Sequence, residues 1–345
     1  MASIHEFLNS PIVALPRVRT DPDFHRFISS MLDAYTTAID TLDPDCHLCA
    51  RIRARKADAE MVRQHVEDAV GRYLEGHAAR AYEQVDQALN YIARSLQTLF
   101  TRPVANDVVA PLYRMVRNGA AAVNKGWLFH CPFNVRHEVG QHRYGIPGFP
   151  CLYLGGSLRV CQVESRVPDA DLSRVAIGEF EVIAPLKLLN FAYRPSALAD
   201  IAGGSALRDQ GANPPLEQFI IDYAICWPLI AASSIEVMHD RKPFVYEYII
   251  PQMILQWIMG RTDCDGIRYF STRWVPSPDA IIRPANFVFP AKPPSNADYL
   301  SHPLISKFSL TDVFRWRSTT GGVDFCQERR DNEMLLHAMP KAPLP

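Results

Sequence analysis

The chain has 345 residues, of which 48% are hydrophobic and 21% charged, and its formal net charge is −1. This composition is typical of a water-soluble globular protein with one large domain or two smaller ones. The near-neutral charge excludes a general attraction to nucleic acid or to an anionic membrane. No apolar run reaches the length of a membrane span, and residues 1–20 show no secretion signal. We therefore expect a cytoplasmic protein with no membrane partner.

Two long helical patterns occupy the first third of the chain. Apolar residues recur at helical spacing from Pro22 to Ile39 and again from Ala57 to Leu99, with a break or kink at Gly76. The polar faces carry mixed charge, which is typical of a solvated surface. We predict an all-α N-terminal domain over residues 1–105, with partner binding or homo-oligomerisation through its helices as the default role.

Beyond residue 101 the composition shifts toward proline, glycine and aromatic residues, and short strands alternate with helices. We expect a second domain over residues 106–345, with an insertion near 192–248 and an irregular, proline-rich tail after Pro290. The segment 192–215 reads as a loop or lid. The predicted fold class is α+β, a mixed β core with flanking helices. Strands are expected at 112–117, 151–154, 174–183, 186–191, 267–273 and 286–289, and helices at 158–167, 216–232 and 251–259.

The stretch from Arg143 to Glu164 contains the first functional candidate. A short apolar strand ends at a glycine pair, and Ser157 is a natural N-cap for the helix that follows. Helical spacing places Glu164 beside apolar residues on the inward side of that helix. A carboxylate there must be paired, hydrogen-bonded or needed for chemistry. The alternative is a partly exposed glutamate at the edge of an amphipathic helix.

Metal-ligand patterns are weak. The eight cysteines are scattered, so we expect them to be reduced. Cys46 and Cys49 supply half of a zinc site at best; they are either packing thiols or share a zinc ion with distant ligands. His130, His137 and His142 are irregularly spaced, which favours capping or solvated histidines over a ligand set. We expect no metal, and the chain also lacks the nucleotide-binding and hydrolase motifs that would indicate a Rossmann enzyme, an NTPase or an α/β hydrolase.

Five short motifs in order resemble the RES domain family over residues 111–285. They are Leu112-Tyr113-Arg114, Arg143-Tyr144-Gly145, Leu152-Tyr153-Leu154, Glu164 and Gly266-Ile267-x-Tyr269-x-Ser271-x-Arg273. The interval between Glu164 and Ser271 is longer than the family pattern, which leaves the serine less secure than the glutamate. The resemblance implies a fold similar to ADP-ribosyltransferase toxins and a toxin that consumes NAD+, often paired with a helix-turn-helix antitoxin.

The chemistry that the resemblance implies needs residues of these types. Cleavage of the nicotinamide–ribose bond passes through an oxocarbenium-like centre, which a fixed carboxylate such as Glu164 stabilises. Arg114 and Arg143 suit phosphate groups, and Ser271 suits the ribose or the carboxamide. Further contacts to NAD+ are expected from Tyr113, Tyr153, Tyr269 and Arg273.

Several alternatives stay open at this point. Water, phosphate or a protein side chain could accept the ADP-ribose. Without the resemblance, the two arginines are equally well read as structural ion-pair residues, Tyr153 as a core strand residue and Ser271 as a strand-end cap. The competing function is a non-catalytic nucleotide-binding or interaction protein with a helical partner-binding domain.

Overall fold

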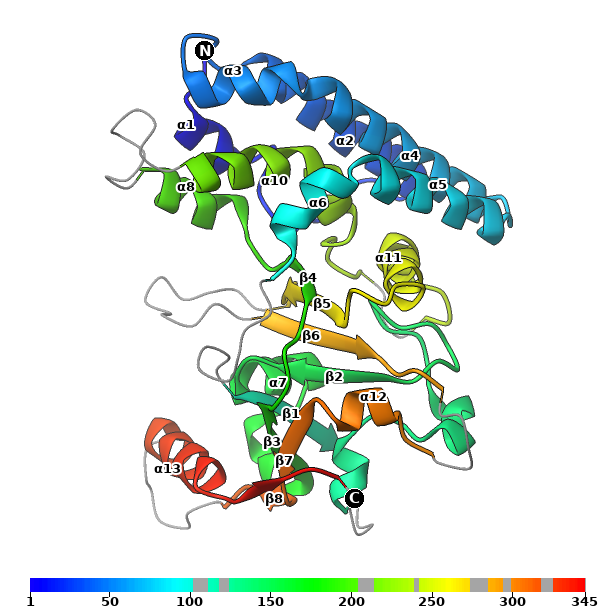
Figure 1. Ribbon diagram of the computed structural model, residues 1–345, viewed down its shortest axis with the longest axis vertical. Coiled ribbons are helices and arrows are strands. Elements are labelled where there is room, and N and C mark those ends of the chain that lie inside the picture. The colour runs from blue at the N-terminus through cyan, green and yellow to red at the C-terminus, as the bar shows by residue number, and fades with distance from the viewer. Residues whose placement is uncertain are drawn as a thin grey trace. The chain divides into compact units, whose positions relative to one another are not determined.

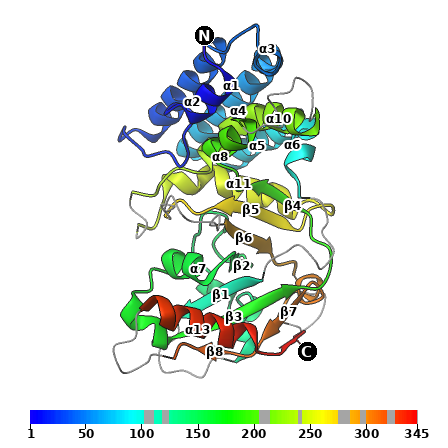
Figure 2. The same cartoon turned by 90° about the vertical axis from the view of Figure 1, so that its left-hand side faces the viewer.

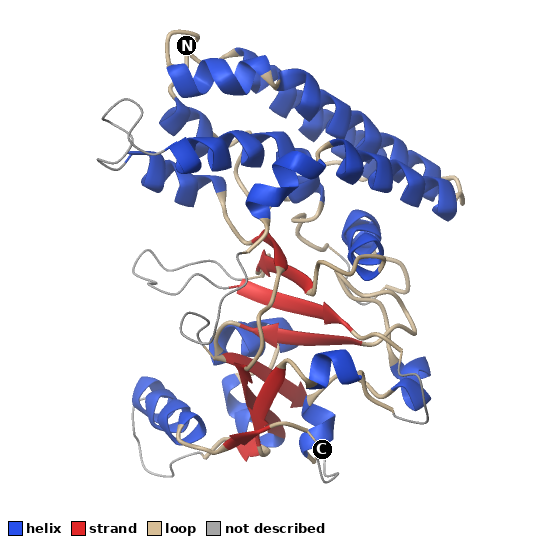
Figure 3. Cartoon of the chain, viewed as in Figure 1, coloured by secondary structure: helices blue, strands red, loops and turns tan. Residues whose placement is uncertain are grey.

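The computed structural model describes residues 1–101, 111–117, 124–203, 214–238, 242–273, 285–293, 299–317 and 325–344. The chain divides into two compact units. Unit 1 comprises residues 1–100, 142–144 and 189–260, and unit 2 comprises residues 101–141, 145–188 and 261–345. In Figure 3, unit 1 is largely helical, whereas most of the strands belong to unit 2.

The helices of unit 1 agree well with the sequence patterns (Figure 1). The first expected helix is α2, and the second pattern is divided into α4, α5 and α6, with Gly76 at φ +88° in the turn between α4 and α5. The bounds are α1 Ile4–Asn9, α2 Phe24–Asp40, α3 His47–Ala54, α4 Lys56–Leu74, α5 Ala78–Tyr91, α6 Ala93–Leu99, α8 Pro195–Gly203, α10 Pro214–Ala232 and α11 Ile249–Met259. Residues 246–248 form the short 3-10 helix η4.

Residues 189–260 differ from the expected division, because they pack with the N-terminal helices rather than with the second domain. The reason is α10, whose described residues from Ile220 to Ala232 are all buried and must therefore be covered on every side. It packs against α3, α4 and α6. Trp227 stacks on Tyr35 with ring centroids 4.0 Å apart, and its indole nitrogen donates to the Val13 carbonyl at 3.0 Å. Part of the predicted loop 192–215 is the helix α8, and residues 204–213 lie outside the described residues.

Most of the sheet belongs to unit 2. Over the described residues the sheet has nine strands in the order β4-β5-β6-β2-β1-β3-β7-β9, with β8 paired to β3. The printed registers of β1 with β2 and β3, of β6 with β2 and β5, and of β7 with β3 and β9 are antiparallel. The bounds are β1 Leu112–Arg117, β2 Cys151–Gly155, β3 Val175–Val182, β4 Leu188–Phe191, β5 Gly266–Phe270, β6 Ala285–Pro290, β7 Phe308–Thr311, β8 Phe314–Arg315 and β9 Lys341–Ala342. Helices and a sheet together confirm the α+β class.

Two helices cover one face of this sheet: α7 (Leu158–Ser165) and α13 (Phe325–His337). Figures 1 and 2 show both beside β1 and β3, and Leu158 of α7 shares a buried cluster with Leu336 of α13 and Ile177 of β3. The remaining elements of unit 2 are η1 Lys125–Leu128, η2 Phe133–Glu138, η3 Asp169–Arg174 and α12 His302–Ile305.

The expectation of an irregular tail after Pro290 is wrong. The described residues after Pro290 contain three strands and two helices, and β7 continues the sheet because Phe308 and Leu310 present apolar side chains to the core. Residues Phe314–Arg315, within this expected tail, form strand β8. Within the described part of the chain, no helix has the length and apolarity that a membrane span requires.

Candidate active site

The glycine pair after β2 determines where α7 lies. A Cβ atom on Gly155 would stand 2.6 Å from the Cys161 sulfur, so only glycine lets the helix approach the strand this closely. Ser157 caps the helix as predicted, its Oγ accepting from the Val160 amide at 3.2 Å. The helix ends at Arg166, which adopts a left-handed conformation with φ 50°. Glu164 therefore lies in the last turn of a short helix held against the sheet.

The Glu164 carboxylate is bound on both oxygens. The Asn286 side-chain amide donates to Oε1 at 2.6 Å, and Arg273 Nε lies 3.5 Å from Oε2. The glutamate side chain remains 30% exposed, so a ligand can reach it from solvent. This carboxylate is neither in bulk solvent nor sealed in the core, which is the arrangement expected of a group that acts on a bound molecule.

The two partners of Glu164 come from the neighbouring strands β5 and β6. These strands approach so closely that a Cβ on Gly266 would stand 2.2 Å from the Val288 carbonyl oxygen. Ser271 follows β5, is fully buried, and its Oγ accepts from the Arg273 amide at 3.2 Å. The serine thus shapes the turn that carries Arg273 to Glu164. Ser271 and Arg273 belong to one sequence motif, and the structure places both near Glu164. We call these three residues and Asn286 the Glu164 group.

Asn286 was not among the predicted site residues. It is 6% exposed and lies in a strand whose six residues are all buried and otherwise apolar or proline. A lone amide in such a strand must have a hydrogen-bond partner, because an unpaired buried amide is costly. That polar position was the signal in the sequence. Its partner could not be deduced, since Glu164 is distant along the chain.

Arg114 of β1 has an unsatisfied guanidinium nitrogen. Its Nη1 atom is inaccessible to solvent and has no hydrogen-bond acceptor among the residues that the structure describes, although the residue as a whole is only partly buried. Burial lowers the pKa of this guanidinium from 12.5 to about 10. The groups that oppose the shift are Cys161, Tyr153 and Cys131, with no carboxylate among them. The side chain is therefore positively charged at neutral pH and able to bind an anion.

Cys161 connects Arg114 with Glu164. Its sulfur donates to the Tyr113 carbonyl at 3.1 Å. The pKa of the thiol is raised to about 12, chiefly by burial; the Glu164 charge contributes to the rise and the Arg114 charge opposes it. Both charges therefore act on the pKa of this thiol, and Arg114 and Glu164 both belong to unit 2.

The predicted tyrosines occupy different surroundings. Tyr113 lies opposite Glu179 in the β1–β3 register, and burial together with the Glu179 charge raises the pKa of its phenol. Glu179 is fully buried and bound by His337 at 2.9 Å and Lys341 at 2.8 Å. Tyr113 therefore faces the side of the sheet that α13 covers. Tyr153 is partly exposed and close enough to Arg114 to affect its pKa.

Tyr269 lies on β5 directly opposite Asn286, which places it beside the Glu164 group. Arg143 belongs to unit 1, so the structure does not assign it to that group. It is 8% exposed, and its two terminal nitrogens donate to the Ser233 and Ile235 carbonyls at 2.9 and 2.8 Å. Its expected role as a phosphate ligand stays a prediction.

Among the candidate metal ligands, His130 has a structural role. His130 is buried, which lowers its pKa to about 4, and its Nε2 accepts from the Ser301 amide at 2.8 Å. Cys46 and Cys49 are free thiols. Within the ranges that the structure describes, no three histidine, cysteine, aspartate or glutamate side chains are grouped to hold a metal ion.

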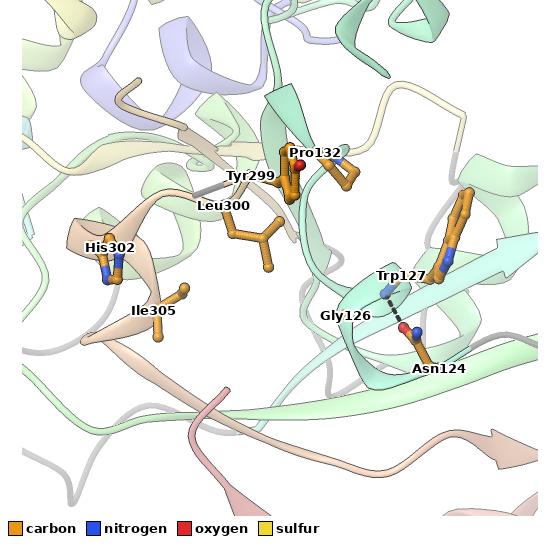
Figure 4. Close-up of a pocket in the computed structure, with 8 residues that line it drawn as sticks. All are labelled: Asn124, Gly126, Trp127, Pro132, Tyr299, Leu300, His302 and Ile305. Carbon is orange, nitrogen blue, oxygen red and sulfur yellow. Dashed lines mark hydrogen bonds between the residues drawn. The ribbon is translucent and has the colours of Figure 1, made fainter. Parts of the chain in front are cut away.

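A separate pocket of about 330 Å³ lies in unit 2, and none of the predicted site residues lines it. Figure 4 shows the Tyr299 ring beside Pro132 and the Asn124 side chain turned back to the Trp127 amide, which donates to it at 3.3 Å. The lining residues are Asn124, Gly126, Trp127, Pro132, Tyr299, Leu300, His302 and Ile305.

Comparison with known proteins gives one informative likeness. The chain is 29% identical over 219 residues to a curated protein of Bacillus subtilis (strain 168) named "Putative toxin YopC". The alignment covers 62% of this chain and 49% of that protein, so the chain spans about half the length of its curated relative. No protein-family model matches the chain, and no solved structure matches it.

Proposed function

We propose that this protein is a toxin that consumes NAD+ by breaking the bond between nicotinamide and ribose, with Glu164 as the central catalytic group. The observation that carries the proposal is the Glu164 carboxylate, held on one oxygen by Asn286 and on the other by Arg273 and still open to solvent. The similarity to the Bacillus subtilis protein named as a toxin supports the toxin assignment. The resemblance to the RES domain family is the reason for proposing NAD+ as the substrate.

The reaction needs a fixed negative charge beside the sugar. When the glycosidic bond breaks, both electrons leave with nicotinamide, and the ribose carbon becomes positively charged. A carboxylate already oriented by Asn286 and Arg273 stabilises that charge without having to reorganise. The acceptor then attacks the same carbon. Water yields ADP-ribose, phosphate yields its phosphorylated derivative, and a protein side chain yields a modified protein.

Arg114 is the proposed phosphate-binding residue. Its buried Nη1 has no acceptor in the described part of the protein, and a guanidinium is well suited to the oxygens of a pyrophosphate. Binding of that group would satisfy a charge that the fold leaves unpaired. Ser271 keeps Arg273 in place, and Tyr153 and Tyr269 are proposed to contact the substrate.

Three further features of the protein are proposals that do not depend on the site itself. An antitoxin partner follows from the toxin assignment, in agreement with the family resemblance. Homo-oligomerisation through the helices of unit 1 and the ADP-ribosyltransferase-like fold of unit 2 remain predictions.

Turnover of NAD+ by the purified protein tests the proposal. We expect nicotinamide release, measured by chromatography with and without phosphate, and a loss of about 10²- to 10³-fold in Glu164→Gln. Glu138→Gln is the matched control, because the Glu138 side chain is 75% exposed in unit 2 and should be dispensable. A folded wild-type protein that binds NAD+ without cleaving it, or does not bind it, would instead favour the non-catalytic alternative.

A further inference from the structure

We infer that Asn286 is a positioning residue that orients the Glu164 carboxylate for the reaction. This inference rests on the proposed function, since it assigns a role within the same site. The two side chains meet at 2.6 Å between Asn286 Nδ2 and Glu164 Oε1, a short hydrogen bond to a charged acceptor. A carboxylate oxygen only accepts, so the amide must present its NH2 group to Glu164.

The backbone of Asn286 is held on both sides. In the register, its Cα lies opposite Gly155 of β2 and opposite Tyr269 of β5, so β6 is an inner strand at this point. Cross-strand neighbours share a face of the sheet. The Cβ direction of Gly155 points at Cys161 of α7, which places the Asn286 side chain on the α7 face. An inner strand thus presents one amide directly to the helix that carries Glu164.

The charge distribution explains why an amide is suited to this position. Arg273 is the cationic partner of Glu164, and its charge partly cancels the negative charge that the ribose carbon needs. Asn286 holds the other oxygen without adding positive charge. Among the described residues, the groups that face the carboxylate are one neutral donor from β6, one guanidinium after β5 and the neutral Cys161 thiol on its own helix. Of these three, the amide fixes the rotation of the carboxylate at no electrostatic cost to the reaction.

Asn286→Asp is the sharpest test, because it keeps the shape and removes the donor. Two carboxyl groups at this distance cannot both stay ionised, so the variant should lower kcat by about 10²-fold at neutral pH with a smaller effect on KM. Lowering the pH places a shared proton between them and recreates a donor. Activity relative to wild type should then recover at least tenfold as the carboxyl pair takes up that proton.

Two control variants distinguish loss of Glu164 orientation from a general loss of protein stability. Asn286→Leu has no proton to gain, so its deficit should not recover at low pH. Asn190→Asp is the matched variant of a buried asparagine elsewhere, since Asn190 is 7% exposed and its side-chain oxygen accepts from the Ala192 amide at 3.1 Å, whereas its NH2 group has no partner among the described residues. It should lose little activity and show no acid recovery. An Asn286→Asp deficit that is the same at every pH overturns the inference.

Thermal unfolding gives a second readout that does not need turnover. The folded Asn286→Asp variant binds a proton more tightly than the unfolded chain, so its stability falls as the pH rises above about 4. Its Tm deficit relative to wild type should therefore widen by about 2 °C or more between pH 4 and pH 7, and that of Asn190→Asp should not. A constant deficit shows that Asn286 does not hold Glu164. Absence of wild-type turnover together with a widening deficit overturns the proposed function alone.

Discussion

Replacing Arg114 with methionine should make the protein more stable and less active. The Nη1 atom of the guanidinium is buried and has no acceptor in the described ranges of the chain, and burial lowers the pKa of the Arg114 guanidinium from 12.5 to about 10. A shift of this size corresponds to about 3 kcal/mol of cost for keeping the charge in the folded state. The cost is fully present below pH 10, where the side chain carries its proton in both the folded and the unfolded chain.

Methionine keeps most of the side-chain packing and removes the charge. Allowing for lost contacts, we expect the free energy of unfolding at pH 7 to rise by about 1–2 kcal/mol, measured by urea titration. Arg174→Met is the matched control, because the Arg174 side chain is 80% exposed and should change stability by less than about 0.5 kcal/mol. NAD+ should stabilise the wild type and not Arg114→Met. Destabilisation by Arg114→Met would show that the guanidinium has a structural role and would refute the reasoning.

Two further predictions concern Gly155 and His130, two residues of unit 2. Gly155→Ala should lower the free energy of unfolding by about 1–3 kcal/mol and also reduce NAD+ turnover. The added methyl group would stand 2.6 Å from the Cys161 sulfur and push α7 away. An unchanged urea unfolding curve would contradict this prediction. His130 has its pKa lowered from 6.5 to about 4, so wild-type stability should fall by about 3 kcal/mol as the pH drops from 6.5 to 4. His130→Gln should show a flatter pH dependence in the same unfolding assay, and an equal slope would exclude His130 as the cause.

Local features of the fold could be predicted because each depends on neighbouring residues. Strand β1 has the expected bounds, Ser157 caps α7, and the pattern from Ala57 to Leu99 is divided near Gly76. Periodicity and capping act over a few residues, so a single sequence contains them. The C-terminal elements were missed because their residues lack these local signals. In α13, Leu336 is buried in the cluster shared with α7, but the surrounding residues are mostly charged and show little helical periodicity.

Features that depend on distant residues could be predicted only in part. Glu164, Ser271 and Arg273 were selected from their motifs, and the structure places all three together. Asn286 was missed because its partner lies 122 residues away and is brought close only by the β2–β6 pairing. The assignment of residues 189–260 to unit 1 was also missed, since it depends on α10 packing against helices from the start of the chain.

The most direct test of the central claim is nicotinamide release from NAD+ by the wild type and by Glu164→Gln, measured side by side on protein shown to be folded by circular dichroism. The proposed chemistry predicts release by the wild type and a loss of about 10²-fold or more in the variant. Equal release by both proteins would mean that the Glu164 carboxylate does not stabilise the breaking bond, and no release by either would mean that NAD+ is not the substrate.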